Sequence, residues 1–146
     1  MLVAEWCLIT VVLKAVNAFV PKNFVQVNIT SLQQESDFSR LKQSRNKYIA
    51  KSAIIVFDQT PISANTPSEI RAGFIVTKKT GIAVKRNRIR RRLRAALRAA
   101  SKICPVSGYD IIFIAKRQAL SIIFADMVAE LVQALEKMRN YSGSER

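Results

Sequence analysis

The side chains most able to carry chemistry lie in residues 78–98, KKTGIAVKRNRIRRRLRAALR. Between Ile70 and Tyr109 there are twelve lysines and arginines and no acidic residue. From Lys85 to Lys102, arginine outnumbers lysine by seven to two. Guanidinium groups bind phosphate oxygens in a two-pronged geometry and also stack on bases. The segment therefore predicts a binding site for a polyanion, with nucleic acid as the first candidate and an anionic membrane surface as the second.

Candidate catalytic and metal-binding residues are few. The 146 residues include no histidine, which removes the commonest general base and the commonest metal ligand. Cys7 and Cys104 are isolated and form no CxxC motif, so neither a zinc site nor a disulfide framework is indicated, and we interpret Cys104 as a reduced thiol. The ten acidic residues are scattered. We therefore expect no catalytic residues in the protein itself and no metal or cofactor bound by it.

The apolar residues within the basic segment indicate how it is positioned. At 100° per residue, one helical stripe contains Ile89, Leu93, Ala96, Leu97 and Ala100. Arg86, Arg90 and Arg94 repeat along one border of this stripe, whereas Lys85, Arg88, Arg91 and Arg92 point away from it. The alternatives are a flexible tail or a solvated face without a ligand. The regular stripe disfavours the tail, and the absence of acidic partners disfavours the solvated face.

The flanking pattern predicts a single α/β sandwich domain, as the chain length also suggests. We expect strands over 48–58, 70–77 and 109–115, the last buried on both faces, and a surface loop over 59–68. Helices are expected over 31–44, from after Gly81 to about Ala100, and over 121–140. In the last of these, Ile123, Met127, Leu131, Leu135 and Met138 repeat at spacings of three and four. Ser36-Asp37 could alternatively cap a shorter first helix.

Residues 1–29 differ in character from the rest and form an N-terminal extension of unknown role. The uninterrupted apolar run from Trp6 to Leu13 is eight residues long, too short to span a bilayer. Val16-Asn17-Ala18 loosely imitates a signal-peptidase site, but Glu5 occupies the position of a basic leader, which argues against export. The remaining interpretations are a short extra strand or helix, or an appendage to the domain. We expect residues 141–146 to be a flexible C-terminus.

Residues 71–94 resemble the protein component of bacterial ribonuclease P. The family motif is Arg-Asn, two residues, Lys/Arg-Arg, two residues and Arg, and it fits Arg86, Asn87, Arg90, Arg91 and Arg94 in register. The preceding Thr77-Lys78-Lys79-Thr80-Gly81 also fits, as do Asp37-Phe38 and the strand from Asp110 to Lys116. The resemblance covers about residues 31–137.

The resemblance implies a domain over 30–140 with the order αβββαβα, a four-stranded sheet and a left-handed βαβ crossover, as in the second domain of ribosomal protein S5. General rules favour right-handed crossovers, so this handedness comes from the resemblance alone. The implied activity is that of an accessory subunit of an RNA-based endoribonuclease. The protein joins a catalytic RNA, about one protein per RNA, and helps to remove the 5′ leader of precursor tRNA in the cytoplasm. The RNA and its Mg²⁺ ions perform the hydrolysis, and neither DNA nor a membrane is a partner.

Two sets of site residues follow from the resemblance. Contacts with the RNA subunit are implied for Lys78, Lys85, Arg86, Asn87, Arg88, Arg90, Arg91 and Arg94. Contacts with the leader are implied for Phe38, Thr77, Lys79, Lys116 and Arg117, and Phe38 could alternatively be only a core anchor. The sequence departs from the family at Ile82, where Asn is usual, and at Lys42, where a second aromatic often lies. The alternative function is that of a generic RNA-binding or ribosome-associated protein without a role in cleavage.

Overall fold

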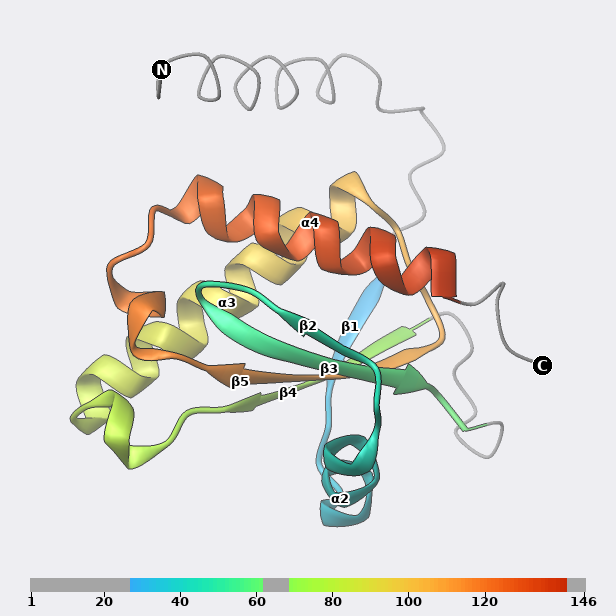
Figure 1. The fold of residues 1–146 in the computed structure, drawn as a ribbon, viewed down its shortest axis with the longest axis horizontal. Coiled ribbons are helices and arrows are strands. Elements are labelled where there is room, and N and C mark those ends of the chain that lie inside the picture. The colour runs from blue at the N-terminus through green and yellow to red at the C-terminus, as the bar shows by residue number, and fades with distance from the viewer. Residues whose placement is uncertain (1–26, 62–68, 142–146) are drawn as a thin grey trace.

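The computed structural model describes residues 27–61 and 69–141, which form three layers (Figure 1). Helices α3 and α4 cover one face of a mixed sheet and the short helix α2 lies on the other. Within the described residues the sheet has five strands in the order β1-β4-β5-β3-β2. The elements are β1 (Asn28–Ser31), α2 (Glu35–Gln43), β2 (Lys47–Ile49), β3 (Ala53–Gln59), β4 (Glu69–Ile75), η1 (Lys78–Thr80), α3 (Ala83–Ile103), β5 (Tyr109–Ala115), η2 (Arg117–Leu120) and α4 (Phe124–Tyr141).

Strand β5 is the centre of the sheet. It pairs with β4 in parallel and with β3 antiparallel, so its apolar sequence YDIIFIA is enclosed on both faces, as predicted. Since β4 and β5 are parallel neighbours, the chain between them must cross over the sheet, and α3 is that crossover. The predicted strand–helix–strand unit is therefore confirmed.

The main core lies between the sheet and the pair α3 and α4. The predicted stripe of α3 is confirmed, because Ile89, Leu93 and Leu97 have no solvent-exposed surface. From α4, Met127 and Leu131 pack into the same core, and the helix as a whole continues the predicted apolar repeat. This packing holds α3 as a rigid element, and the flexible-tail alternative is excluded.

The sheet has one strand more than the four predicted. Strand β1 pairs in parallel with β4, with Ile29 beside Ile70, and begins two residues before the predicted domain start. The backbone N–H of Leu32 then donates to the carbonyl of Ala72 over 3.1 Å, so the chain stays extended after Ser31. As a result α2 begins at Glu35 rather than Ser31, and Gln34 rather than Ser36 precedes it as the N-cap residue. The partner that keeps this segment extended lies about 40 residues away, outside the reach of local patterns.

The single strand predicted over 48–58 is instead a hairpin of β2 and β3. A tight turn interrupts it, in which the N–H of Ala50 donates to the carbonyl of Ala53 over 3.0 Å. Glu130 of α4 caps the turn by accepting hydrogen bonds from the backbone N–H groups of Lys51 and Ser52 and from the Ser52 hydroxyl, at 3.1, 3.2 and 2.6 Å. The turn is thus stabilised by a carboxylate from a distant helix.

The last helix begins at Phe124, three residues later than predicted, because the N–H groups of Ser121 and Ile122 both donate back to the carbonyl of Gln118 in the turn that follows η2. Ile123 was predicted as the first residue of the apolar repeat of this helix, but it lies before the helix and is 49% exposed. The predictions for residues 1–26, for most of the 59–68 loop and for residues 142–146 lie outside the described residues. Among the residues that the structure describes, no helix combines the length and apolarity needed to cross a membrane.

Candidate RNA-binding surfaces

Helix α3 starts without a capping side chain. Ile82 has the extended backbone of an N-cap residue and its carbonyl accepts from the N–H of Arg86 over 3.0 Å, but its side chain cannot accept a hydrogen bond. Ile82 and Val84 are 67% and 73% exposed, so both present apolar surface at the basic end of the molecule. The departure from the family at Ile82 therefore affects the helix terminus and leaves its first N–H groups without a side-chain partner.

One arginine of α3 belongs to the fold rather than to the exposed surface. Arg92 was predicted to point away from the apolar stripe, but its guanidinium is partly buried and donates to the carbonyls of Ala119 and Leu120, both at 2.7 Å, and of Ile122. It thereby ties α3 to the turn that precedes α4. No side-chain pattern indicates this contact, because the three acceptors are backbone atoms.

The border row of arginines faces the β4 side of α3. The guanidinium of Arg94 lies over the ring of Phe74, 5.4 Å from its centroid, as in a cation–π contact. Arg90 donates to the Asn87 side chain over 3.4 Å, and the Nε of Arg86 is buried without a hydrogen-bond partner among the described residues. The Arg94 contact thus places this border of α3 against β4.

Four cations of the predicted RNA-subunit set are exposed and unpaired among the described residues, and they lie just before α3 and along its outer side. The side chains of Lys78, Lys85, Arg88 and Arg91 are exposed and have no hydrogen bond or ion pair with any described residue. The structure thus presents a row of unneutralised charges on a rigid helix. Such a row suits phosphate groups, whose binding would release counterions.

The residues predicted to contact the leader gather at one end of the sheet. Ile75 and Ile114 are paired at the ends of β4 and β5, and the chain stays extended through Thr77 and Lys116. Ile75 and Ile114 face the side of the sheet on which α2 lies. Because side chains alternate along an extended chain, Thr77 and Lys116, two residues later, lie on that same side.

Two hydrogen bonds tie the segment after β5 to its neighbours, one to the β2–β3 turn and one to the turn after β4. The Lys116 ammonium donates to the carbonyl of Ala50 over 2.7 Å, and Arg117 donates to the carbonyl of Lys79 over 2.9 Å. The second bond brings Lys79 and Arg117 together from η1 and η2. Four of the five predicted leader residues therefore lie at this strand end.

Phe38 is the fifth, and it packs against the sheet from α2. Its ring contacts the small cluster of Leu32, Leu41 and Ile112 and is only partly buried. A methyl group at Gly73 would lie 2.6 Å from the Phe38 Cε1 atom, so this glycine provides the space for the ring. The core contact of Phe38 is thus confirmed, while its contact with a leader stays a prediction. Lys42, at the other departure from the family, is exposed one turn later.

A buried charge network fixes α2 to the sheet. Asp110 is fully buried and accepts from Arg71 at 2.7 and 2.5 Å, from Thr60 at 3.0 Å and from Arg40 of α2. Asp37 of α2 accepts from Arg71 at 3.1 Å. Hydrogen bonding to Asp110, opposed by burial and reinforced by the charges of both carboxylates, raises the pKa of Arg71. The sequence pattern indicated at most a capping role for Asp37 and no charge partner for Asp110.

The described residues contain no cluster of three or more histidine, cysteine, aspartate or glutamate side chains that could hold a metal ion. Cys104 is a free, buried thiol, and burial raises its pKa. This thiol is therefore a protonated core group at neutral pH.

Comparison with known proteins identifies the family. The ribonuclease P family model matches residues 28–139. The chain belongs to the ribonuclease P protein family. Curated relatives named ribonuclease P protein component include one from Gluconacetobacter diazotrophicus, 32% identical over 106 residues that cover 73% of this chain and 88% of the relative. Another, from Brucella melitensis, is 32% identical over 122 residues, covering 81% and 86%.

Solved ribonuclease P protein structures share the fold. The structure from Staphylococcus aureus at 22% identity covers 75% of this chain and 94% of its own, with a TM-score of 0.60. The one from Thermotoga maritima at 21% identity covers 73% and 96%, also with a TM-score of 0.60. The predicted α+β sandwich and the predicted ribonuclease P family are thus both confirmed.

Proposed function

We propose that this chain is the protein subunit of a ribonuclease P. In this role it binds a catalytic RNA through α3 and the 5′ leader of precursor tRNA at the strand end beside α2. The observation that carries the proposal is family membership combined with the exposed, unneutralised cations of α3. The RNA and its Mg²⁺ ions would perform the hydrolysis, in the cytoplasm and with about one protein per RNA, as the resemblance implies.

The contact with the RNA subunit rests on Lys78, Lys85, Arg86, Asn87, Arg88, Arg90, Arg91 and Arg94. The packing of its apolar residues in the main core stabilises α3 against the repulsion between neighbouring cations. Arg92 is excluded from this surface because three backbone carbonyls already occupy its guanidinium.

The contact with the leader rests on the strand-end residues and on Phe38. Arg117 donates to the backbone carbonyl of Lys79, which brings its guanidinium to the η1 turn that follows the exposed Thr77. The partly exposed ring of Phe38 lies on the same side of the sheet and could stack on a base, a contact that tolerates different leader sequences. The exposed Lys42 in place of a second aromatic adds charge to this surface.

Reconstitution tests the proposal. The protein alone should not cleave precursor tRNA, but it should increase cleavage by a bacterial ribonuclease P RNA at low Mg²⁺ concentration. If that RNA cleaves equally well with and without the protein at physiological salt, the proposal is wrong. Equal affinity for duplex DNA, structured RNA and leader-bearing precursor would instead favour a generic nucleic-acid-binding protein.

Paired substitutions separate the two surfaces. Arg90→Ala with Arg91→Ala should weaken binding to the RNA subunit and reduce the slope of log affinity against log salt by about 1.5 to 2, as expected if each arginine contacts one phosphate. Lys116→Ala with Arg117→Ala should instead weaken binding of precursor tRNA by the assembled enzyme. Lys47→Ala with Lys137→Ala removes two positive charges from β2 and α4 and serves as the control. Equal effects of the first two pairs on both measurements would refute the assignment of separate surfaces.

A further inference from the structure

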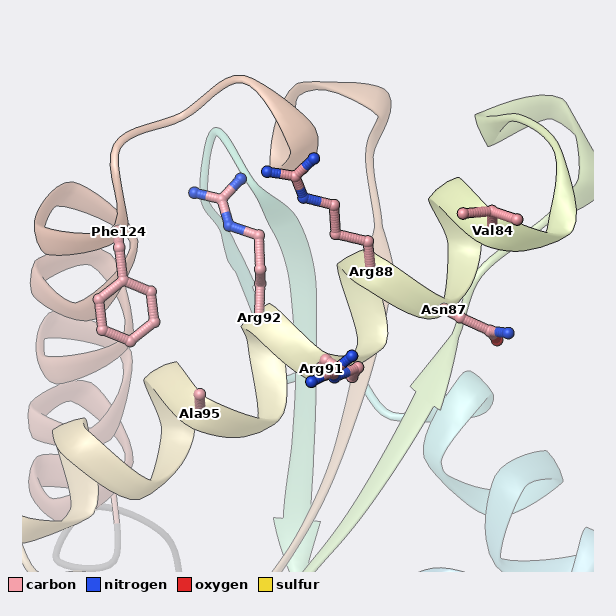
Figure 2. A pocket seen from close by; sticks show the side chains of 7 residues that line it. All are labelled: Val84, Asn87, Arg88, Arg91, Arg92, Ala95 and Phe124. Atoms are coloured by element: carbon pink, nitrogen blue, oxygen red, sulfur yellow. The ribbon is translucent and has the colours of Figure 1, made fainter.

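A hollow of about 680 Å³ lies between the outer side of α3 and the start of α4 (Figure 2). It shares Asn87, Arg88 and Arg91 with the predicted RNA-subunit surface, but its apolar residues Val84 and Phe124 have no role there. Six of its residues come from successive turns of α3, namely Val84, Asn87, Arg88, Arg91, Arg92 and Ala95. Phe124, the first residue of α4, closes one end, and Val84 lies at the other (Figure 2). At 1.5 Å per residue, the helix from Val84 to Ala95 extends the hollow over about 16 Å.

The two walls of the hollow are fixed relative to each other. The hydrogen bonds of Arg92 to the carbonyls of Ala119, Leu120 and Ile122 connect α3 to the segment directly before Phe124. The N–H of Met127 also donates to the carbonyl of Ile123 over 3.1 Å, so α4 begins in a defined position. The aromatic side chain is therefore set on a rigid support beside the basic helix.

The chemistry of the lining is mixed. Phe124 is 42% exposed and Val84 is 73% exposed, so the hollow offers both an aromatic ring and aliphatic surface. Arg88 and Arg91 add two guanidinium groups that have no hydrogen bond or ion pair with any described residue. A ligand that satisfies all of these groups combines a flat ring with negative charge.

We propose that this hollow binds an unpaired nucleotide of RNA, with its base stacked on Phe124 and its flanking phosphates paired with Arg88 and Arg91. The inference rests on the proposed function, because it takes RNA as the partner of α3, and adds a base contact to a surface otherwise assigned to phosphates. An unpaired nucleotide is required because the faces of bases inside a helix are already stacked. The site thus recognises a bulge, loop or single strand rather than a duplex.

Two RNA probes with equal charge test the base contact. One is a twelve-nucleotide oligoadenylate, and the other has the same sugar–phosphate backbone but lacks the bases of its central nucleotides. At fixed salt the protein should bind the intact oligomer about 5- to 10-fold tighter, the lower range for stacking of a single base. Phe124→Ala should reduce this ratio at least 3-fold, whereas Phe124→Tyr should preserve it.

Two further variants serve as controls. Ile123→Ala removes a neighbouring exposed apolar side chain that does not line the hollow, and it should leave the ratio unchanged. Phe38→Ala removes the aromatic ring on the opposite side of the sheet and measures its separate contribution. A ratio that is unchanged in Phe124→Ala overturns the proposal, whether or not Phe38→Ala changes it. Thermal unfolding of each variant verifies that the fold is retained.

The same variants distinguish a failure of this site from a failure of the proposed function. With a bacterial ribonuclease P RNA, Phe124→Ala should weaken binding about 3- to 10-fold without changing the salt slope, because no phosphate contact is removed. If Phe124→Ala has no effect while Arg90→Ala with Arg91→Ala still does, only the stacking site is refuted. If neither changes the affinity, α3 does not bind that RNA and the proposed function fails as well.

Discussion

Gly73 and Phe38 should be energetically coupled. Gly73→Ala should lower the free energy of unfolding when Phe38 is present and raise it when Phe38 is replaced by alanine. A Cβ atom at Gly73 would lie 2.6 Å from Cε1 and 2.9 Å from Cζ of Phe38, whereas carbon atoms in contact are normally about 3.5–4.0 Å apart. In Gly73→Ala the ring must therefore move by about 1 Å, and such overpacking costs roughly 1–3 kcal/mol. Alanine in place of glycine within a strand recovers about 0.5–1 kcal/mol. The net expectation is a loss of about 0.5–2 kcal/mol.

In a Phe38→Ala background the clash is absent. The next nearest atom is Cδ1 of Leu32 at 3.4 Å, close to ordinary contact, so Gly73→Ala should then stabilise the protein by about 0.5–1 kcal/mol. The double-mutant cycle should give a coupling energy of about 1–3 kcal/mol.

Urea unfolding of the four proteins, followed by circular dichroism, measures each free energy of unfolding. If Gly73→Ala has the same effect in both backgrounds, the proposed contact between the ring and the glycine is refuted. A change in the urea dependence of one variant would indicate an altered unfolded state, and that variant would be excluded from the cycle. The precursor tRNA affinity of the assembled enzyme should fall in Gly73→Ala if the Phe38 ring contacts the leader.

Three other substitutions should change the stability of the protein in a defined direction. Ile82→Asn should stabilise the protein by about 1 kcal/mol in urea unfolding, because the amide oxygen can cap α3, and Ile82→Ala should not. Asp110→Asn should destabilise it by about 3–5 kcal/mol, because Arg71 and Arg40 both lose the fully buried carboxylate that they share; a loss below 1 kcal/mol would contradict this. Since burial raises the pKa of Cys104, the unfolded chain ionises first as pH rises above the usual value near 9, and stability should fall there. Cys104→Ala should lose less stability than the wild type between about pH 8 and 10, and an identical loss would refute the assignment.

Local sequence patterns were sufficient to predict an element when the residues of that element alone determine its structure. Strand β5 matches its predicted bounds because seven consecutive residues suit a strand enclosed on both faces. The apolar stripe of α3 was predictable because it follows the helical period and involves only residues within the helix. These two elements position most of the residues implied by the family resemblance.

Local patterns did not predict the features of the structure that depend on a partner distant in the sequence. Strand β1 exists because β4 offers an edge to pair with, and the β2–β3 turn is capped by Glu130 from α4. Arg92 looked like any other arginine of the basic row, but backbone carbonyls of the η2 region bind it. The site around Phe124 could not be predicted for the same reason, because its two walls come from helices joined only in the folded chain.

The position of β5 also has a consequence for folding during synthesis. β3 and β4 do not pair with each other, and only β5 joins the β1–β4 pair to the β2–β3 hairpin. The strand that completes the sheet is therefore the last one made, and α3 leaves the ribosome before the sheet on which it docks is complete. Until Ala115 has emerged, the basic helix lacks a finished apolar surface to cover its stripe, so the sheet cannot be completed before β5 is made and must form through pairings distant in sequence.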